Sequence, residues 1–234
     1  MNDTFTTEQR AKLEDYLANH FLPSGLGSKE SACSIAAINL AITGELTDKI
    51  PDCMSRVLGR ATITLQDNMS TEMRNSARYK ALLPNMAGTG RAKEKERLAV
   101  LIDWMWSTVL PQLQPLADDK GFGAEWSSMC RLKTSEAARC AADAAATAAR
   151  AVHAAYAAGA GAYAAVTAVT AGHAAARSAA AARSAARAAA YAAGHAAARS
   201  AAAAAYANTG TFWNAVDPIG VLERMTYLKG DENG

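Results

Sequence analysis

The sequence contains few of the residues that build metal sites, disulfide frameworks and acid–base centres. Its 234 residues include four cysteines and four histidines. The cysteines form no C-x-x-C pair, so we expect reduced thiols of a cytosolic protein and no metal site. No Ser-His-Asp order, H-E-x-x-H motif, Walker loop or dinucleotide fingerprint occurs in the chain. These absences predict a protein that is not an enzyme and that needs no cofactor.

The sequence also lacks segments that direct a chain into or across a membrane. The first ten residues, MNDTFTTEQR, contain no basic stretch followed by an apolar one. No run of about 18 strongly apolar residues follows, because arginine, histidine and aspartate interrupt the alanine-rich stretch. We therefore expect a cytoplasmic protein that makes no membrane contact.

The charge is nearly balanced over the chain but uneven along it. The formal net charge of +2 excludes a polyacidic mimic of nucleic acid and a strongly basic nucleic-acid coat. Residues 137–207 carry six arginines against one aspartate, and 43 of these 71 residues are alanine. An ordinary globular domain does not have this composition. The sequence therefore divides into an ordinary N-terminal part and a basic, alanine-rich part.

Residues 1–130 predict a helical globular head built from several short helices. Apolar residues recur every three or four positions over residues 7–21, 28–44, 51–65, 71–83 and 92–110, which is the helical period. The second of these stretches is apolar nearly all round, so we expect it in the centre of the core. Trp104 and Trp106 are interpreted as core aromatics. The segment 86–91 (MAGTGR) lacks the spacing of a phosphate-binding loop, and we interpret it as a turn.

Residues 131–207 predict a long helical rod with two different faces. The larger and polar side chains between Arg139 and Tyr206 recur every three or four residues, and so lie on one side of a helix. Alanine, the best helix former, fills the other side. Gly159 and Gly161 are the weakest point, where one rod would become a helical hairpin. The eleven residues from Gly172 recur from the glycine 22 positions later, through function or through slippage of a coding repeat.

The two faces of the rod predict binding. Alanine side chains let helices approach closely, so we expect the alanine face to pack on another helix, of this chain or of a second copy in a homo-oligomer. The opposite face carries residue types that are common at protein interfaces. The candidate binding residues are His173, Arg177, Arg183, Arg187, Tyr191, His195 and Arg199. Two alternatives stay open for this face: a solvated side, or a nucleic-acid surface, which six arginines over about 100 Å do not favour.

The C-terminal segment, residues 208–234, contains one more amphipathic helix, beginning near Pro218. Its apolar residues, among them Ile219, Leu222 and Met225, would be exposed if the segment stood alone. We therefore expect this helix to dock back on the globular part, and the last residues to be loose. The predicted fold is all-α, with a helical head, a long alanine-rich helix or hairpin, and a C-terminal helix.

Three stretches of the sequence, residues 31–55, 73–90 and 98–118, resemble an uncharacterised family of phage- and prophage-type proteins. Members of that family join a small helical head to an alanine-rich tail. The resemblance implies an accessory protein of a mobile element that acts in the host cytosol by protein–protein contact, for example by blocking a host defence system. It implies no catalytic residue.

The alanine-rich tract is also similar in composition to the alanine-rich helical antifreeze proteins. Those proteins carry regularly spaced threonines, whereas Thr147, Thr167 and Thr170 show no sustained eleven-residue spacing. This resemblance implies an alternative function, ice binding through the alanine face.

Overall fold

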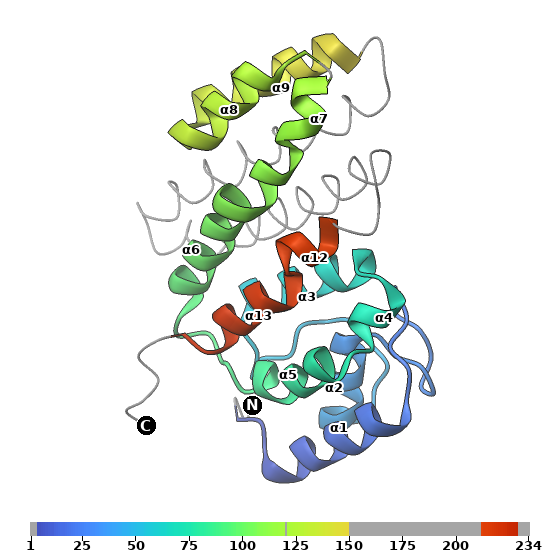
Figure 1. Cartoon of the computed structure of the whole chain (residues 1–234). Helices are drawn as coiled ribbons and strands as arrows, with labels where there is room; N and C mark the ends of the chain where they lie inside the picture. Colours follow the sequence, from blue (N-terminus) through green and yellow to red (C-terminus); the bar gives the residue numbers. More distant parts are fainter. Residues whose placement is uncertain (1–3, 120, 150–211, 229–234) are drawn as a thin grey trace. The chain divides into compact units, whose positions relative to one another are not determined.

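The computed structural model of the chain describes residues 4–119, 121–149 and 212–228 (Figure 1). Every regular element in these ranges is a helix, which confirms the predicted all-α fold. The described part forms two compact units. Unit 1 comprises Met1–Arg97 and Pro218–Gly234, and unit 2 comprises Leu98–Asp217. The boundary therefore falls inside α6 (Glu94–Trp104), whereas the sequence placed the end of the head near residue 130.

Unit 1 is built from short helices of both ends of the chain. They are α1 (Thr7–Asn19), α2 (Ser34–Thr43), α3 (Arg56–Asn68), α4 (Thr71–Arg74), α5 (Ala77–Ala87), the start of α6, and α13 (Pro218–Thr226). The apolar helix α2 packs against α1, α3 and α5, and most of its residues are buried, as predicted for the central helix. The C-terminal helix α13 packs against α3 and α5, which confirms that it docks back on the N-terminal helices.

Side-chain caps decide where the helices of unit 1 begin. Thr6 and Gln9 form a capping box at the start of α1, and Ser55 caps α3 by accepting a hydrogen bond from the amide of Leu58. The expected start of the second helix near residue 28 was wrong. A turn closes over residues 28–31, and α2 begins only after Cys33, whose sulfur accepts a hydrogen bond from the amide of Ala36.

The predicted helix over residues 71–83 is in fact two helices, and it does not end before Pro84. Asn75 ends α4 because its side chain exchanges hydrogen bonds with the backbone of Leu22. Ser76 then caps α5, which continues through Pro84 to Ala87. These boundaries depend on a partner more than 50 positions away, so no local pattern predicts them.

Several buried polar groups of unit 1 form hydrogen bonds with other segments of the unit. The hydroxyls of Ser34 and Tyr79 lie 2.9 Å apart in the core, and the amide of Ser34 donates to Gln66 Oε1. The guanidinium of Arg74 is also buried and donates to the carbonyls of Leu22, Gln66 and Met69. Since a buried polar group without a partner costs free energy, these bonds favour one arrangement of the helices.

In unit 2 the end of α6 continues into a π-helical turn (Met105–Val109) and a 3-10 turn (Leu110–Leu113). The helices α7 (Gln114–Asp119), α8 (Gly123–Leu132), α9 (Ser135–Ala149) and α12 (Phe212–Val216) complete the described part of this unit. Pro111 explains the change of helix type, because it has no amide hydrogen and its ring clashes with the carbonyl of a preceding α-helical turn. The indoles of Trp104 and Trp126 are buried and donate to the carbonyls of Val216 and Leu110.

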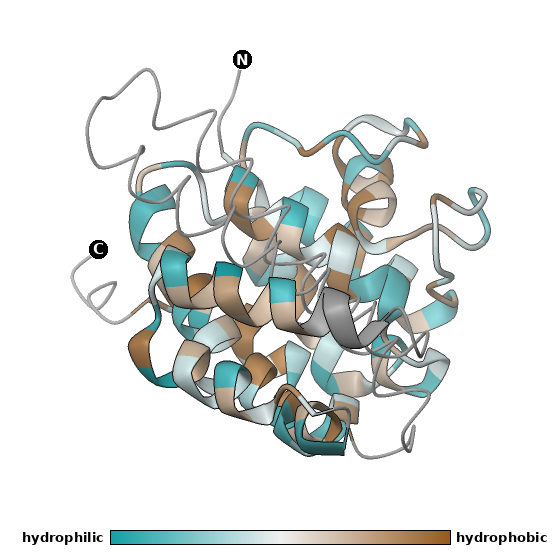
Figure 2. Cartoon of the chain, turned by 90° about the horizontal axis from the view of Figure 1, so that it is seen from above, coloured by the Kyte–Doolittle hydropathy of each residue, from teal (hydrophilic) through white to brown (hydrophobic). Residues whose placement is uncertain are grey.

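The beginning of the alanine-rich tract lies in α9, which packs against α8. Ala137, Ala138, Ala141 and Ala142 are buried, whereas Arg139 is exposed. Over these residues the alanine side of the helix is covered by the chain itself and the arginine points outward, as predicted. Figure 2 shows apolar and polar residues sharing single helices, the pattern of helices with one covered and one solvated side.

Candidate functional site

The binding residues predicted from the sequence lie outside the described residues. This applies to His173, Arg177, Arg183, Arg187, Tyr191, His195 and Arg199, and to the predicted hinge at Gly159 and Gly161. The search for a site therefore concerns the two units. The four cysteines belong to the described part and are thiols there, as expected. No group of three or more metal-ligating side chains occurs among the described residues.

Unit 1 contains a cavity of about 400 Å³ that we call the basic pocket. Its lining comes from α1, the end of α5, the following loop, the start of α6 and the end of α13. The lining residues are Arg10, Asn85, Gly88, Thr89, Ala92, Lys93, Arg97, Thr226 and Tyr227. Three of these side chains are basic and none is acidic. The volume falls in the range of roughly 300–1,000 Å³ that is typical of ligand pockets.

Arg97 is the buried cation of the basic pocket. The residue is 2% exposed, although it lines the cavity. Its Nε donates to the carbonyl of Met225 at 3.0 Å, and its Nη2 donates to the carbonyl of Thr89 at 3.2 Å. These bonds tie α6 to α13 and to the loop after α5. These two bonds fix the position of the guanidinium.

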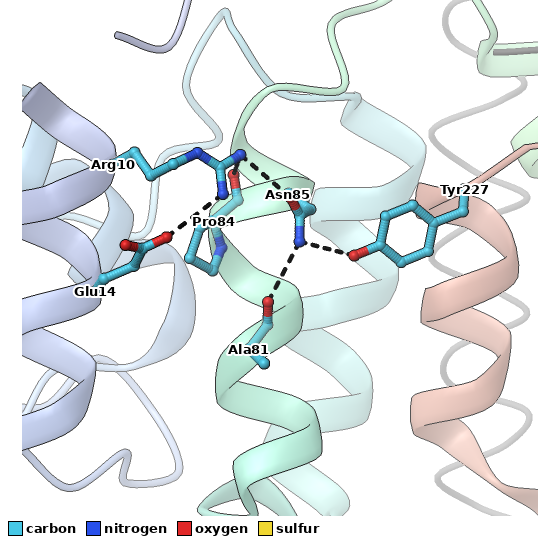
Figure 3. Close-up of polar contacts among 6 residues, drawn as sticks. All are labelled: Arg10, Glu14, Ala81, Pro84, Asn85 and Tyr227. Carbon is cyan, nitrogen blue, oxygen red and sulfur yellow. Dashed lines mark hydrogen bonds and ion pairs between the residues drawn. The ribbon is translucent and has the colours of Figure 1, made fainter. Parts of the chain in front are cut away.

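Arg10 and Tyr227 stand on either side of Asn85 in the same pocket (Figure 3). Nη2 of Arg10 donates to Pro84 O at 3.0 Å and to Asn85 Oδ1 at 3.2 Å. Nδ2 of Asn85 in turn donates to the hydroxyl of Tyr227 at 2.7 Å. The side chain of Asn85 therefore links α1, α5 and the residue that follows α13.

A second cavity of about 360 Å³ adjoins the basic pocket, since both are lined by Arg10 and Asn85. It lies between α1 and α5, and we call it the α1–α5 groove. The groove is lined by Arg10, Glu14, Leu17, Ala18, Lys80, Ala81, Pro84 and Asn85. Leu17, Ala18, Ala81 and Pro84 give it an apolar surface.

The charges of the α1–α5 groove are largely used within the protein. Nζ of Lys80 donates to the carbonyls of Leu17 and His20 at 2.8 Å each and so caps the C-terminal end of α1. Glu14 lies 3.5 Å from Nη1 of Arg10. The groove therefore offers mainly apolar contact.

The basic pocket suits an anionic group. Arg10, Lys93 and Arg97 present guanidinium and ammonium donors, and hydrogen bonds between charged groups are about twice as strong as neutral ones. Two of the three cations are held in place by backbone carbonyls, so an anion would not need to order them first. Partial burial reduces the screening of these charges by water and salt.

Most of this site could not be recognised from the sequence. The segment 86–91 was interpreted as a turn, but its first two residues end α5 and only the rest is non-helical. In this turn Gly90 has a φ of 56° and its amide donates to Cys53 O. This turn nevertheless lines the basic pocket through Gly88 and Thr89. Arg10, Arg97 and Tyr227 belong to distant parts of the chain and follow no motif.

Unit 2 contains a polar cluster around Asp103, next to Trp104. Lys133 Nζ donates to Ser107 Oγ at 2.8 Å, and Ser107 Oγ donates to Asp103 Oδ1 at 3.0 Å. All three residues are exposed. The cluster joins the end of α6 to the end of α8 at the surface, and we interpret it as structural.

The described helices include none that is long and apolar enough to cross a membrane. The resemblances to phage-type proteins and to antifreeze proteins stay predictions. No family model matches the chain, and neither a curated protein nor a solved structure matches it.

Proposed function

We propose that this protein acts by non-covalent binding and that it holds an anionic group of its partner in the basic pocket. The observation that carries the proposal is the lining of this cavity, which includes Arg10, Lys93 and Arg97 and no carboxylate. Arginine and lysine side chains donate charge-assisted hydrogen bonds, and these suit an anionic ligand.

The surroundings of Arg97 support the same proposal. Arg10 and Lys93 add positive charge to the lining of the cavity, which includes no carboxylate. Asn85, Thr89 and Tyr227 supply polar groups that can orient a ligand. These groups can bind and orient a ligand.

The test is anion binding by the full chain and two charge-reversal variants. Lys93→Glu places a carboxylate in the pocket, and Lys95→Glu makes the same change at an exposed position of α6 outside it. We expect pyrophosphate to raise the melting temperature of the wild type and of K95E, but not of K93E, because ligand binding stabilises only the state that binds. Equal shifts for all three proteins, or an equal shift with sodium chloride at the same ionic strength, would refute the proposal.

Self-association through the alanine face is a separate proposal. Within the described residues, α9 contains the beginning of this face. Its first buried alanines are covered within unit 2 and are not available to a second copy. Oligomerisation through this face therefore concerns residues 150–207. Light scattering coupled to size-exclusion chromatography tests it, and a monomer at high concentration would exclude it.

A further inference from the structure

We infer that unit 1 has a second ligand site, which takes a small organic molecule with an ammonium group and an apolar body. The site is a cavity of about 460 Å³ that we call the α2 pocket. It is lined by the start of α1, the last turns of α2 and the loop that follows α2. The α2 pocket shares no lining residue with the basic pocket, so this inference goes beyond the proposed function and does not depend on it.

Asn39 is the buried polar side chain of the α2 pocket. The residue is 6% exposed, although it lines the cavity. Its Nδ2 donates to Thr47 O at 2.7 Å and to Lys49 O at 2.8 Å, so both hydrogens are used and the orientation of the amide is fixed. Oδ1 lies on the other side of the amide plane's axis and accepts no hydrogen bond from the residues that the structure describes. Since a buried acceptor without a partner costs free energy, this oxygen suits a ligand that donates.

Several donors around Asn39 are already used within the protein. Oγ1 of Thr43 donates to Asn39 O, and the amide of Glu45 donates to Thr43 Oγ1. The amide of Lys49 donates to Thr47 Oγ1. The pocket therefore offers the ligand acceptors at this end, among them Asn39 Oδ1 and the carboxylate of Glu45.

The end of α2 favours a positive charge in the pocket. The last carbonyls of a helix have no amide partner within the helix and carry its negative end, and the last turn of α2 contains no basic residue. An ammonium group is positively charged and has three donors and no acceptor, which matches this environment. Lys49 also belongs to the lining, but it is exposed, and its long side chain can keep its own ammonium in water.

The apolar part of the lining determines the rest of the ligand. Ile42, Ile50 and Pro51 contribute to it, and Ile50 is held by its close packing against Gly59 of α3. The cavity volume falls in the range of roughly 300–1,000 Å³ that is typical of ligand pockets. An alkyl or aryl body gains free energy by leaving water for these side chains, so the ligand class is a primary alkyl- or arylammonium ion.

The experiment is a titration of the isotope-labelled full chain with pentylammonium chloride, followed by NMR. The signal of the Asn39 side-chain amide is the readout, because a donor at Oδ1 polarises the Nδ2 hydrogens. We expect this signal to shift saturably, with a dissociation constant of about 1 mM. Pentanol lacks the charge, pentanoate has the opposite charge and methylammonium lacks the apolar body. Each should bind at least about tenfold more weakly than pentylammonium.

Two charge-reversal variants test the location of the ammonium group. Glu45→Lys places a cation in the lining, and Asp48→Lys is the matched control at an exposed position of the same loop outside the lining. We expect E45K to weaken pentylammonium binding at least about tenfold and D48K less than about twofold at physiological salt, which screens the more distant charge. Asn39 itself is left unchanged, because its substitution would release the loop that it holds.

Three results would refute the inference. They are an Asn39 signal that does not shift saturably up to about 10 mM pentylammonium, pentanol binding as tightly as pentylammonium, and equal effects of E45K and D48K. None of these results bears on pyrophosphate binding by the basic pocket, so the two proposals fail independently.

Discussion

The carboxylate of Glu94 caps the helix that contains Val57. Its Oε2 accepts a hydrogen bond from the amide of Val57 at 2.9 Å, and its Oε1 accepts one from the amide of Arg56 at 2.8 Å. Both amides belong to the first turn of α3, where helical amides have no partner within the helix and a negative charge is favourable. The sequence predicted that this helix starts near Pro51. The residues around Pro51 do not indicate that Glu94, far along the chain, caps the helix at Arg56 and Val57.

The first prediction follows from this cap. Glu94→Ala should lower the free energy of unfolding by about 1–2 kcal/mol, because two amides lose their acceptor. Glu96→Ala is the control, since Glu96 is exposed on the same helix. Urea denaturation followed by circular dichroism measures both variants, and equal midpoints for the two would contradict the capping role.

The second prediction concerns the close contact between α3 and the chain that precedes it. A Cβ at Gly59 would lie 2.8 Å from Cγ2 and 2.9 Å from Cγ1 of Ile50. Gly59→Ala alone should therefore destabilise the protein by about 1–3 kcal/mol through overpacking. In an Ile50→Ala background the same change should stabilise by up to about 1 kcal/mol, because alanine is the better helix former. A double-mutant cycle without this change of sign would show that Ile50 is not the obstacle.

The third prediction is a pH dependence that arises from Tyr79. Burial raises the pKa of the Tyr79 phenol above its ordinary value of 10.0, and the hydrogen bond with Ser34 only partly opposes this effect. Below pH 10 the phenol is protonated in both the folded and the unfolded chain. Above pH 10 only the unfolded chain loses the proton, so the free energy of unfolding should fall by about 1.4 kcal/mol per pH unit from this residue.

Tyr79→Phe tests this assignment because it removes the ionisable group and keeps most of the ring packing. The variant should be less stable than the wild type by about 1 kcal/mol at pH 8, since it loses a buried hydrogen bond. Above pH 10 the difference should shrink and then reverse. Burial also raises the pKa of Cys33, but this thiol is present in both proteins and cancels in the comparison. Parallel stability curves from pH 8 to 11.5 would rule Tyr79 out as the source.

The fourth prediction concerns the first turns of the alanine-rich tract. Ala141 is completely buried in unit 2, whereas Arg139 is exposed on the same helix. Ala141→Leu should destabilise the protein by about 1–3 kcal/mol, because additional methyl groups have no space, and Arg139→Gln should change stability by less than about 0.5 kcal/mol. Thermal denaturation of the two variants is the measurement. A tolerated leucine would mean that the alanine face is not closely packed here.

The sequence predicted the elements of the fold better than their boundaries or the site. Helical periodicity identified the helices of the head and the C-terminal helix because each carries an apolar face long enough to detect. The break at Asn75 and the late start of α2 depend on hydrogen bonds to other segments, which periodicity does not report. Gly44, in contrast, ends α2 through its own left-handed conformation (φ 76°), and that signal is local.

The candidate site could not be predicted because its residues have no common local context. Arg10 and Arg97 look like ordinary solvated charges of amphipathic helices. Their roles arise only when the carbonyl of Met225 and the side chain of Asn85 come into reach. The seven binding residues predicted from the sequence were chosen because they share one face of the predicted alanine-rich helix. None of them belongs to the lining of the basic pocket, so the two candidate sites consist of different residues.

Unit 1 includes α13, which lies near the C-terminal end of the chain, and this has a consequence for biosynthesis. A nascent polypeptide that has emerged from the ribosome as far as Asp217 already contains α1 to α6 but lacks the helix that packs on α3 and α5. Arg97 then has no Met225 carbonyl to hold it. Unit 1 therefore matures only after translation has passed the entire alanine-rich tract, and prematurely terminated chains contain Arg10 and Lys93 without a completed pocket.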